Sequence, residues 1–105
     1  MLMKVRFTKR ARHEFFHLVD VFTEFAGQKA ANNFIERFNA IGEQLCRHPY
    51  TGYPEPLLMG RKKLYRTKTI NKNYRIIYYV ARINVWIVDI WDRRRNPSAL
   101  KKRLK

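Results

Sequence analysis

The stretch YRTKTINKNYRIIYYV (residues 65–80) indicates two paired strands, because β-branched and aromatic residues lie on both sides of the short polar segment NKN. Residues of these types favour strands, and a short asparagine-containing segment between two strands favours a hairpin turn. Another segment of the same kind, NVWIVDIW (residues 84–91), follows after the short segment ARIN. The chain from about 63 to 92 is therefore predicted to form an antiparallel meander of three strands.

The residues before this meander show helical periodicity. Thr8 is suited to cap a first helix and Gly27 to end it, and the prolines of RHPYTGYPEP would end a second helix. Two amphipathic helices joined by so short a turn are expected to lie antiparallel, as a hairpin over about 8–46. Their apolar stripes would be Ala11, Phe15, Leu18, Phe22 and Phe25 in the first helix, and Ala31, Phe34, Ile35, Phe38, Ile41 and Leu45 in the second.

The order of these segments predicts one α+β domain over residues 1–105, with the order β-α-α-β-β-β. The alternation in MKVRF (residues 3–7) predicts a short first strand, whose partner in the sheet the pattern leaves open. We expect an antiparallel twisted sheet with the helical hairpin packed on one face. The central strand is apolar on both faces, so the basic tail of residues 93–105 or a partner is expected to cover part of the other face.

The charge of the chain is large and lies almost entirely in its second half. The formal net charge is +15, and residues 61–105 hold fifteen basic and two acidic residues, whereas residues 1–60 hold eight and six. So uneven a distribution favours a nucleic acid or an acidic protein as partner. The single cysteine, Cys46, fits a reducing cytoplasm, and neither a membrane-spanning segment nor a secretory signal is expected.

The cations of the hairpin are candidates for a common binding site. Arg66 and Lys68 share one face of their strand, because side chains two positions apart point the same way. If the NKN turn holds two residues, Arg75 joins them on that face, whereas a three-residue turn would send Arg75 to the opposite face. Two-residue turns are the commonest hairpin connection and asparagine tolerates positive φ, so we expect the three cations to converge.

Aromatic rings are expected beside these cations. The same parity argument brings Tyr79 to this face, together with Trp86, Val88 and Ile90 of the last strand. Phosphates attract cations and bases stack on aromatic rings, so the patch is suited to nucleic acid. The structural alternative for Arg75 is an ion pair with Asp89 or Asp92. No metal site is predicted, because His13 and His17 share a helical face without a third ligand nearby.

Several segments together resemble the RelE/ParE superfamily of bacterial toxin–antitoxin toxins. They are FTKRARHEF, AANNFIERFNAIGEQLCRHPYTGYPEP, NYRIIYYV and VWIVDIWDRRRNP, and the resemblance spans almost the whole chain. It implies a small antitoxin as partner and one of two activities. RelE-like members are endonucleases that cut mRNA in the ribosomal A site, and ParE-like members block DNA gyrase.

For the endonuclease activity, the resemblance implies a reaction without metal or cofactor in which the RNA 2′-OH attacks the adjacent phosphate. Lys68 would act as the general base, and Arg75 and Arg95 would hold the scissile phosphate. Asp92 would be an alternative proton carrier, or the partner that orients Arg75. The residues that bind the RNA would be Lys63, Arg66, Tyr79, Arg93 and Arg94.

Three activities stay open at this point. The matched basic positions favour the mRNA endonuclease, for which replacing Arg75 with alanine is expected to abolish growth arrest and leave the protein folded. After Tyr79 the chain has neither a tyrosine nor a histidine, where the superfamily's endonucleases carry one, and this favours the gyrase inhibitor. The remaining alternative is a non-catalytic protein of the same fold that binds only RNA or its antitoxin.

Overall fold

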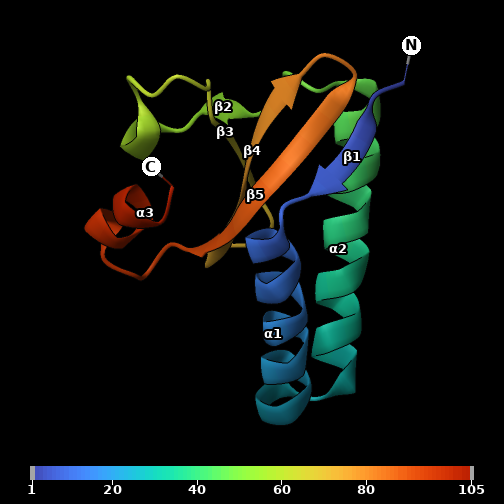
Figure 1. The fold of residues 1–105 in the computed structure, drawn as a ribbon. Helices are drawn as coiled ribbons and strands as arrows, with labels where there is room; N and C mark the ends of the chain where they lie inside the picture. Colours follow the sequence, from blue (N-terminus) through green and yellow to red (C-terminus); the bar gives the residue numbers. More distant parts are fainter. Residues whose placement is uncertain (1, 105) are drawn as a thin grey trace.

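The computed structural model describes residues 2–104, which form a five-stranded sheet with two long helices on one face (Figure 1). The strands are ordered β1-β5-β4-β3-β2 across the sheet. The predicted α+β class, with the helical hairpin against one face, is confirmed. In chain order the elements are β1 (Lys4–Phe7), α1 (Lys9–Ala26), α2 (Gln28–Arg47), β2 (Tyr53–Pro54), the 3-10 helix η1 (Pro56–Leu58), β3 (Arg66–Thr69), β4 (Tyr74–Ala81), β5 (Asn84–Asp92) and α3 (Pro97–Arg103).

The helical hairpin forms where the apolar periodicity places it. The Thr8 hydroxyl oxygen accepts a hydrogen bond from the backbone N–H of Ala11 (3.2 Å) and caps α1 as predicted. Gly27, with φ of +95°, makes the turn into α2. Phe25 is 78% exposed, so its assignment to the buried stripe was wrong. It lies in the last turn of α1, where the hairpin extends beyond the sheet (Figure 1).

The first strand makes the sheet mixed rather than wholly antiparallel. β1 pairs in parallel with β5, with Val5 opposite Val85 and Phe7 opposite Ile87. No local pattern in a four-residue strand could show this partner, since most of the chain lies between β1 and β5. Within residues 2–104, no helix is long and apolar enough to cross a membrane.

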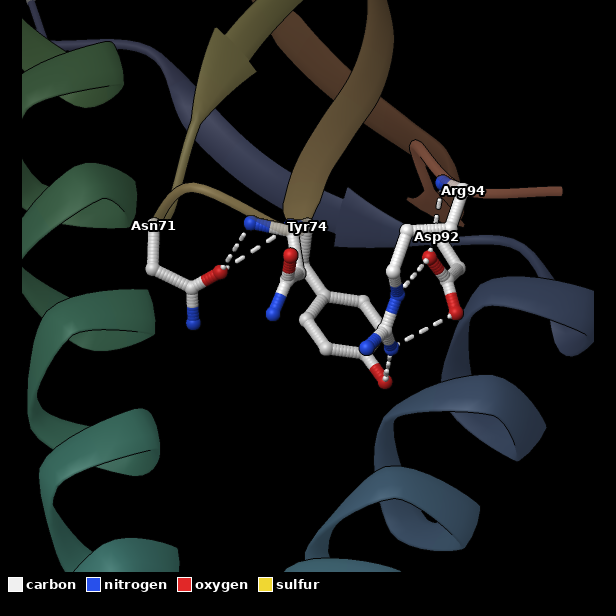
Figure 2. Close-up of polar contacts among 5 residues, drawn as sticks. Asn71, Tyr74, Asp92 and Arg94 are labelled. Atoms are coloured by element: carbon white, nitrogen blue, oxygen red, sulfur yellow. Dashed lines mark hydrogen bonds and ion pairs between the residues drawn. The ribbon is translucent and has the colours of Figure 1, made fainter.

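The turn between β3 and β4 holds three residues, so the predicted two-residue turn was wrong. The Ile70 N–H donates to the Tyr74 carbonyl (2.9 Å), which leaves residues 71–73 as the loop. The Asn71 side-chain oxygen accepts from the backbone N–H groups of Asn73 (2.9 Å) and Tyr74 (3.0 Å), as Figure 2 shows. This side chain closes the loop without the positive φ that a two-residue turn of type I′ needs. Among residues 2–104, Arg82 is the only non-glycine residue with positive φ.

The turn between β4 and β5 holds two residues, Arg82 and Ile83, but the strands change register farther from it. Tyr79 lies opposite Trp86, and a register shift between Ile77 and Tyr78 then places Ile76 opposite Ile90. Trp86 and Val88 therefore share the face of Tyr79, as predicted. Ile90 does not, because the extra residue of a β-bulge reverses the parity and turns its side chain toward the helices.

The C-terminal segment covers the face of the sheet that α1 and α2 leave open. Asn96 caps α3 by accepting from the Ser98 N–H (3.0 Å), and the buried Leu100 side chain packs onto the sheet. The tail or a partner was expected to cover part of this face, and the structure shows the tail. The second core formed in this way contains Leu58, Tyr65, Ile77, Val88, Trp91 and Leu100.

Gly52 is the position at which a single methyl group is expected to disturb the sheet most directly. The Tyr78 hydroxyl accepts from the Gly52 N–H (2.9 Å) and donates to the Pro49 carbonyl (2.8 Å). A Cβ at Gly52 would lie 2.5 Å from the Tyr78 hydroxyl oxygen and 2.7 Å from the Thr67 carbonyl oxygen. Because this backbone oxygen cannot move aside, Gly52→Ala should lower the free energy of unfolding in urea by about 2–3 kcal/mol.

The matched control is Gly42→Ala, in α2. No atom lies within 4 Å of a Cβ at Gly42, so this variant should be as stable as the wild type or up to about 1 kcal/mol more stable. Equal stability of the two variants would show that Tyr78 and the backbone of Thr67 can move to make room for the methyl group.

Candidate functional site

The register of β3 and β4 separates the cations that were predicted to converge. Residues directly opposite each other in a sheet share a face. Lys68 lies opposite Ile76, whose buried side chain packs under α1 and α2, whereas Thr69 lies opposite Arg75. Arg66 and Lys68 are therefore on the helical face of the sheet and Arg75 is on the α3 face. The predicted convergence was wrong, because the turn between β3 and β4 holds three residues and not two.

The two cations of β3 have separate surroundings. The Arg66 guanidinium donates to the Gly52 carbonyl (3.0 Å) and lies 5.1 Å from the centroid of the Tyr50 ring, so it holds the loop that follows α2. Lys68 lies in a hollow of about 240 Å³ lined otherwise by Thr51, Tyr53, Thr67 and Thr69. Neither of these groups is placed to act on a phosphate held by Arg75.

Arg75 is ion-paired with a carboxylate that the sequence interpretation overlooked. Its Nη2 lies 2.8 Å from Oε1 of Glu55, a side chain that is 0% exposed. The other Glu55 oxygen accepts from the Leu57 N–H (3.1 Å) and caps η1. The expected partners, Asp89 and Asp92, bind other arginines. One signal pointed to Glu55, which is the only acidic residue between Glu43 and Asp89.

Three of the predicted site residues nevertheless meet at one pocket. Arg75, Arg93 and Arg95 line a pocket of about 280 Å³ together with Glu55 and Trp91. The Arg95 guanidinium lies 5.0 Å from the centroid of the buried Trp91 ring, and Arg93 and Arg95 are exposed. We call this the arginine pocket. With three guanidinium groups against one carboxylate, it favours an anionic ligand.

Asp92 is occupied by Arg94 on the other side of the sheet. Its oxygens accept from Arg94 Nε (2.9 Å) and Nη2 (2.9 Å), and Arg94 Nη2 also donates to the Tyr74 hydroxyl (3.2 Å), as Figure 2 shows. The hydrogen bonds from the Arg94 side chain hold the pKa of Asp92 below its usual range. Asp92 therefore stays ionised near neutral pH, and it is not the partner that was predicted for Arg75. Its other predicted role, that of a proton carrier, stays a prediction.

Asp89 is the second buried carboxylate, and its partner comes from the tail. It is 0% exposed and accepts from Arg103 Nη2 (2.8 Å) and from the Ile90 N–H (2.9 Å). Arg103 also lies 3.7 Å from Glu14 of α1, so one side chain links α3 to both the sheet and the hairpin. Burial raises the pKa of Asp89 to about 6, against the lowering effect of Arg103.

Two residues predicted to bind RNA lie together on the α3 face. The Lys63 ammonium is 4.5 Å from the centroid of the Tyr79 ring, and Tyr65 packs edge-on against the same ring (5.9 Å). Arg66 and Arg94 are on the helical face and do not join them. The predicted RNA-binding set is thus divided between the two faces of the sheet.

Comparisons with known proteins agree with this architecture. Among solved structures, the chromosomal ParDE toxin–antitoxin system from P. aeruginosa has a TM-score of 0.69 at 16% identity, covering 87% of this chain and 96% of that chain. A YoeB/ParE toxin from Agrobacterium tumefaciens has a TM-score of 0.62 at 19% identity, with coverage of 86% and 98%. The YoeB dimer from Staphylococcus aureus has a TM-score of 0.58 at 20% identity, with coverage of 85% and 94%. At these identities the likeness concerns the fold.

A search of curated proteins finds no significant match. The sequence profile described as the ParE toxin of the type II toxin-antitoxin system, parDE, matches residues 5–97. The matched range runs from β1 through all five strands to the start of α3. The protein therefore belongs to the ParE toxin family of type II toxin–antitoxin systems.

Proposed function

We propose that this toxin arrests growth by binding DNA gyrase and not by cutting mRNA. The observation that carries the proposal is the register of β3 and β4, which puts Lys68 on the face of the sheet away from Arg75. Cleavage of RNA by attack of its 2′-OH on the adjacent phosphate needs a base and a phosphate clamp at the same phosphodiester. A toxin that inhibits its target by binding has no such requirement.

The surroundings of the remaining candidates support the same proposal. Arg75 is neutralised by Glu55, and Asp92 is held ionised by Arg94. No tyrosine or histidine follows Tyr79 that could replace them in proton transfer. ParE-like members of the superfamily are those for which the resemblance implies gyrase as the target, and the family profile that matches is that of ParE.

Endonuclease activity is the second candidate, and the arginine pocket favours it. Arg75, Arg93 and Arg95 would bind a phosphate there whether the nucleic acid is cut or only held. The two candidates share the partner that would control them, an antitoxin encoded with the toxin. Both would act in the cytoplasm, and neither requires a metal or cofactor.

The test measures both activities on the same purified protein. In a supercoiling assay with gyrase and relaxed plasmid, we expect the wild type to inhibit, and Arg93→Ala/Arg95→Ala to need at least about tenfold more protein, the loss expected for interface arginines. Lys68→Ala should inhibit as the wild type does, because Lys68 lies on the other face of the sheet. Inhibition should disappear when the antitoxin is added.

Mapping of RNA ends after induction of the toxin in growing cells tests the endonuclease candidate. Growth arrest with intact message and altered plasmid supercoiling agrees with the proposal. Codon-positioned RNA ends that vanish in Lys68→Ala, together with unimpaired gyrase, would establish the endonuclease instead.

A further inference from the structure

A second basic surface on the α3 side of the sheet remains outside the arginine pocket. Arg61 Nη2 donates to the Lys101 carbonyl (2.9 Å) and so joins the loop after η1 to the last turn of α3. η1 and α3 also contact each other, and both lie at one side of the sheet in Figure 1. We call this the loop–α3 surface, and define it by Met59, Arg61, Lys62, Lys63, Leu64, Lys101 and Lys102.

Among the residues that the structure describes, no carboxylate forms an ion pair with the cations of this surface. No acidic residue occurs between Glu55 and Asp89, or after Asp92. Those three carboxylates are ion-paired with Arg75, Arg103 and Arg94 respectively. Within residues 2–104, the exposed lysines of the loop–α3 surface take part in no salt bridge. Clustered cations without counter-ions repel one another, and a polyanion that replaces its own counter-ions relieves this repulsion.

The surface also presents apolar groups among its cations. Met59 is 62% exposed and Leu64 is 57% exposed, and they flank the sequence Gly-Arg-Lys-Lys. The loop turns at Gly60, with φ of +84°, and encloses a hollow of about 550 Å³ that Tyr65 also lines. Proteins that bind the minor groove combine these two features, since their cations contact phosphates and their apolar side chains contact sugars and base steps.

We propose that the loop–α3 surface binds the phosphodiester backbone of duplex DNA, with Met59 and Leu64 directed at the minor groove. The inference rests on the proposed function, because gyrase works on DNA and its inhibitor would touch the DNA that gyrase holds. The cations lie on two chain segments joined by Arg61, and Lys101 and Lys102 are not among the residues that line the hollow. Cations on separate segments are suited to a polyanion with several phosphates, more than to one small anion.

The test uses DNA alone, without gyrase. Fluorescence anisotropy of a labelled duplex is measured at several salt concentrations with the full-length protein. Lys62→Glu/Lys101→Glu should weaken binding at least about tenfold and reduce the slope of log K against log salt by about 2, one for each lost phosphate contact. Lys4→Glu/Lys29→Glu changes the charge equally on exposed positions of β1 and α2, and should weaken binding less than about threefold.

A third variant separates the apolar contribution from the charge. Met59→Ser/Leu64→Ser should weaken DNA binding and leave the salt slope unchanged, because no phosphate contact is removed. Circular dichroism confirms that each variant is folded. Equal effects of the two charge-reversal pairs, or tighter binding to single-stranded RNA or phosphatidylserine vesicles than to duplex DNA, would overturn the inference. Gyrase inhibition without DNA binding overturns this inference alone, whereas DNA binding without gyrase inhibition overturns the proposed function alone.

Discussion

Replacing Arg75 with methionine is expected to lower the free energy of unfolding by about 3 kcal/mol, the cost of leaving a buried charge without its partner. Methionine keeps the length of the apolar stem and removes the guanidinium. Glu55 is 0% exposed and would then remain in the interior with its counter-ion gone. Urea denaturation followed by fluorescence measures the loss. Arg75→Ala should cost at least as much, so the expectation that this variant stays folded has to be tested before its effect on growth is interpreted.

Two further variants show whether the ion pair is the cause. Arg93→Met removes an exposed guanidinium from the same pocket and should change stability by less than about 0.5 kcal/mol. Arg75→Met/Glu55→Gln removes both charges and should recover at least half of the loss, because no unpaired ion remains in the interior. Additive effects of the two substitutions would show that Glu55 and Arg75 do not depend on each other.

This expectation also decides how the arginine pocket can be tested. Loss of growth arrest in an Arg75 variant would follow from unfolding as well as from lost binding. Arg93 is exposed and takes part in no salt bridge within residues 2–104, so its replacement reports on binding. Arg95 also contacts the Trp91 ring (5.0 Å), so its variants need the same stability measurement.

The second large effect is a loss of stability as pH rises, caused by Asp89. Its pKa is raised by burial from 3.8 in the unfolded chain to about 6 in the folded protein. Between these two values the folded state binds a proton that the unfolded state has released, so the free energy of unfolding falls as pH increases. The contribution is fully present below pH 3.8 and lost above about pH 6. A shift of this size corresponds to about 3 kcal/mol.

The measurement compares the wild type with Asp89→Asn by urea denaturation between pH 4 and pH 7. The difference in free energy of unfolding between the two proteins reports on Asp89 alone. Carboxylates with lowered pKa values, such as Asp92, make stability rise with pH, but they do so equally in both proteins and cancel. As pH rises from 4 to 7, the free energy of unfolding of Asp89→Asn should increase by about 3 kcal/mol relative to that of the wild type. The exposed control Asp20→Asn should show no such trend.

Arg103 offers an independent check on the same group. Arg103→Met leaves Asp89 without its counter-ion, so it should destabilise the protein more at pH 7 than at pH 4, where Asp89 is protonated. An equal loss at both values would mean that Arg103 stabilises α3 through packing against Trp91, whose ring centroid lies 5.5 Å away.

The sequence alone determined the elements and their order, because these depend on contacts between near neighbours. Apolar residues three and four positions apart, the Thr8 cap and Gly27 predict the helical hairpin, and β-branched and aromatic runs predict the meander. The apolar character of both faces of β4 also indicated that the second face is covered in part, by the tail or by a partner, and it is the tail that covers it. The positions and order of these elements do not depend on the register of the sheet.

Which side chains meet depends on the pairing of the strands in the folded protein. One extra residue in the turn at Asn71 sends Arg75 to the face opposite Lys68, and the bulge at Val88 of β5 turns Ile90 toward the helices. A side chain changes face with every one-residue step along a strand, so the position of a cation depends on details that composition does not carry. The pairing of Arg75 with Glu55 and of Arg103 with Asp89 likewise joins residues 20 and 14 positions apart. The fold could therefore be predicted from local patterns. The candidate site could not, because the register of the strands determines which charged side chains share a face of the sheet.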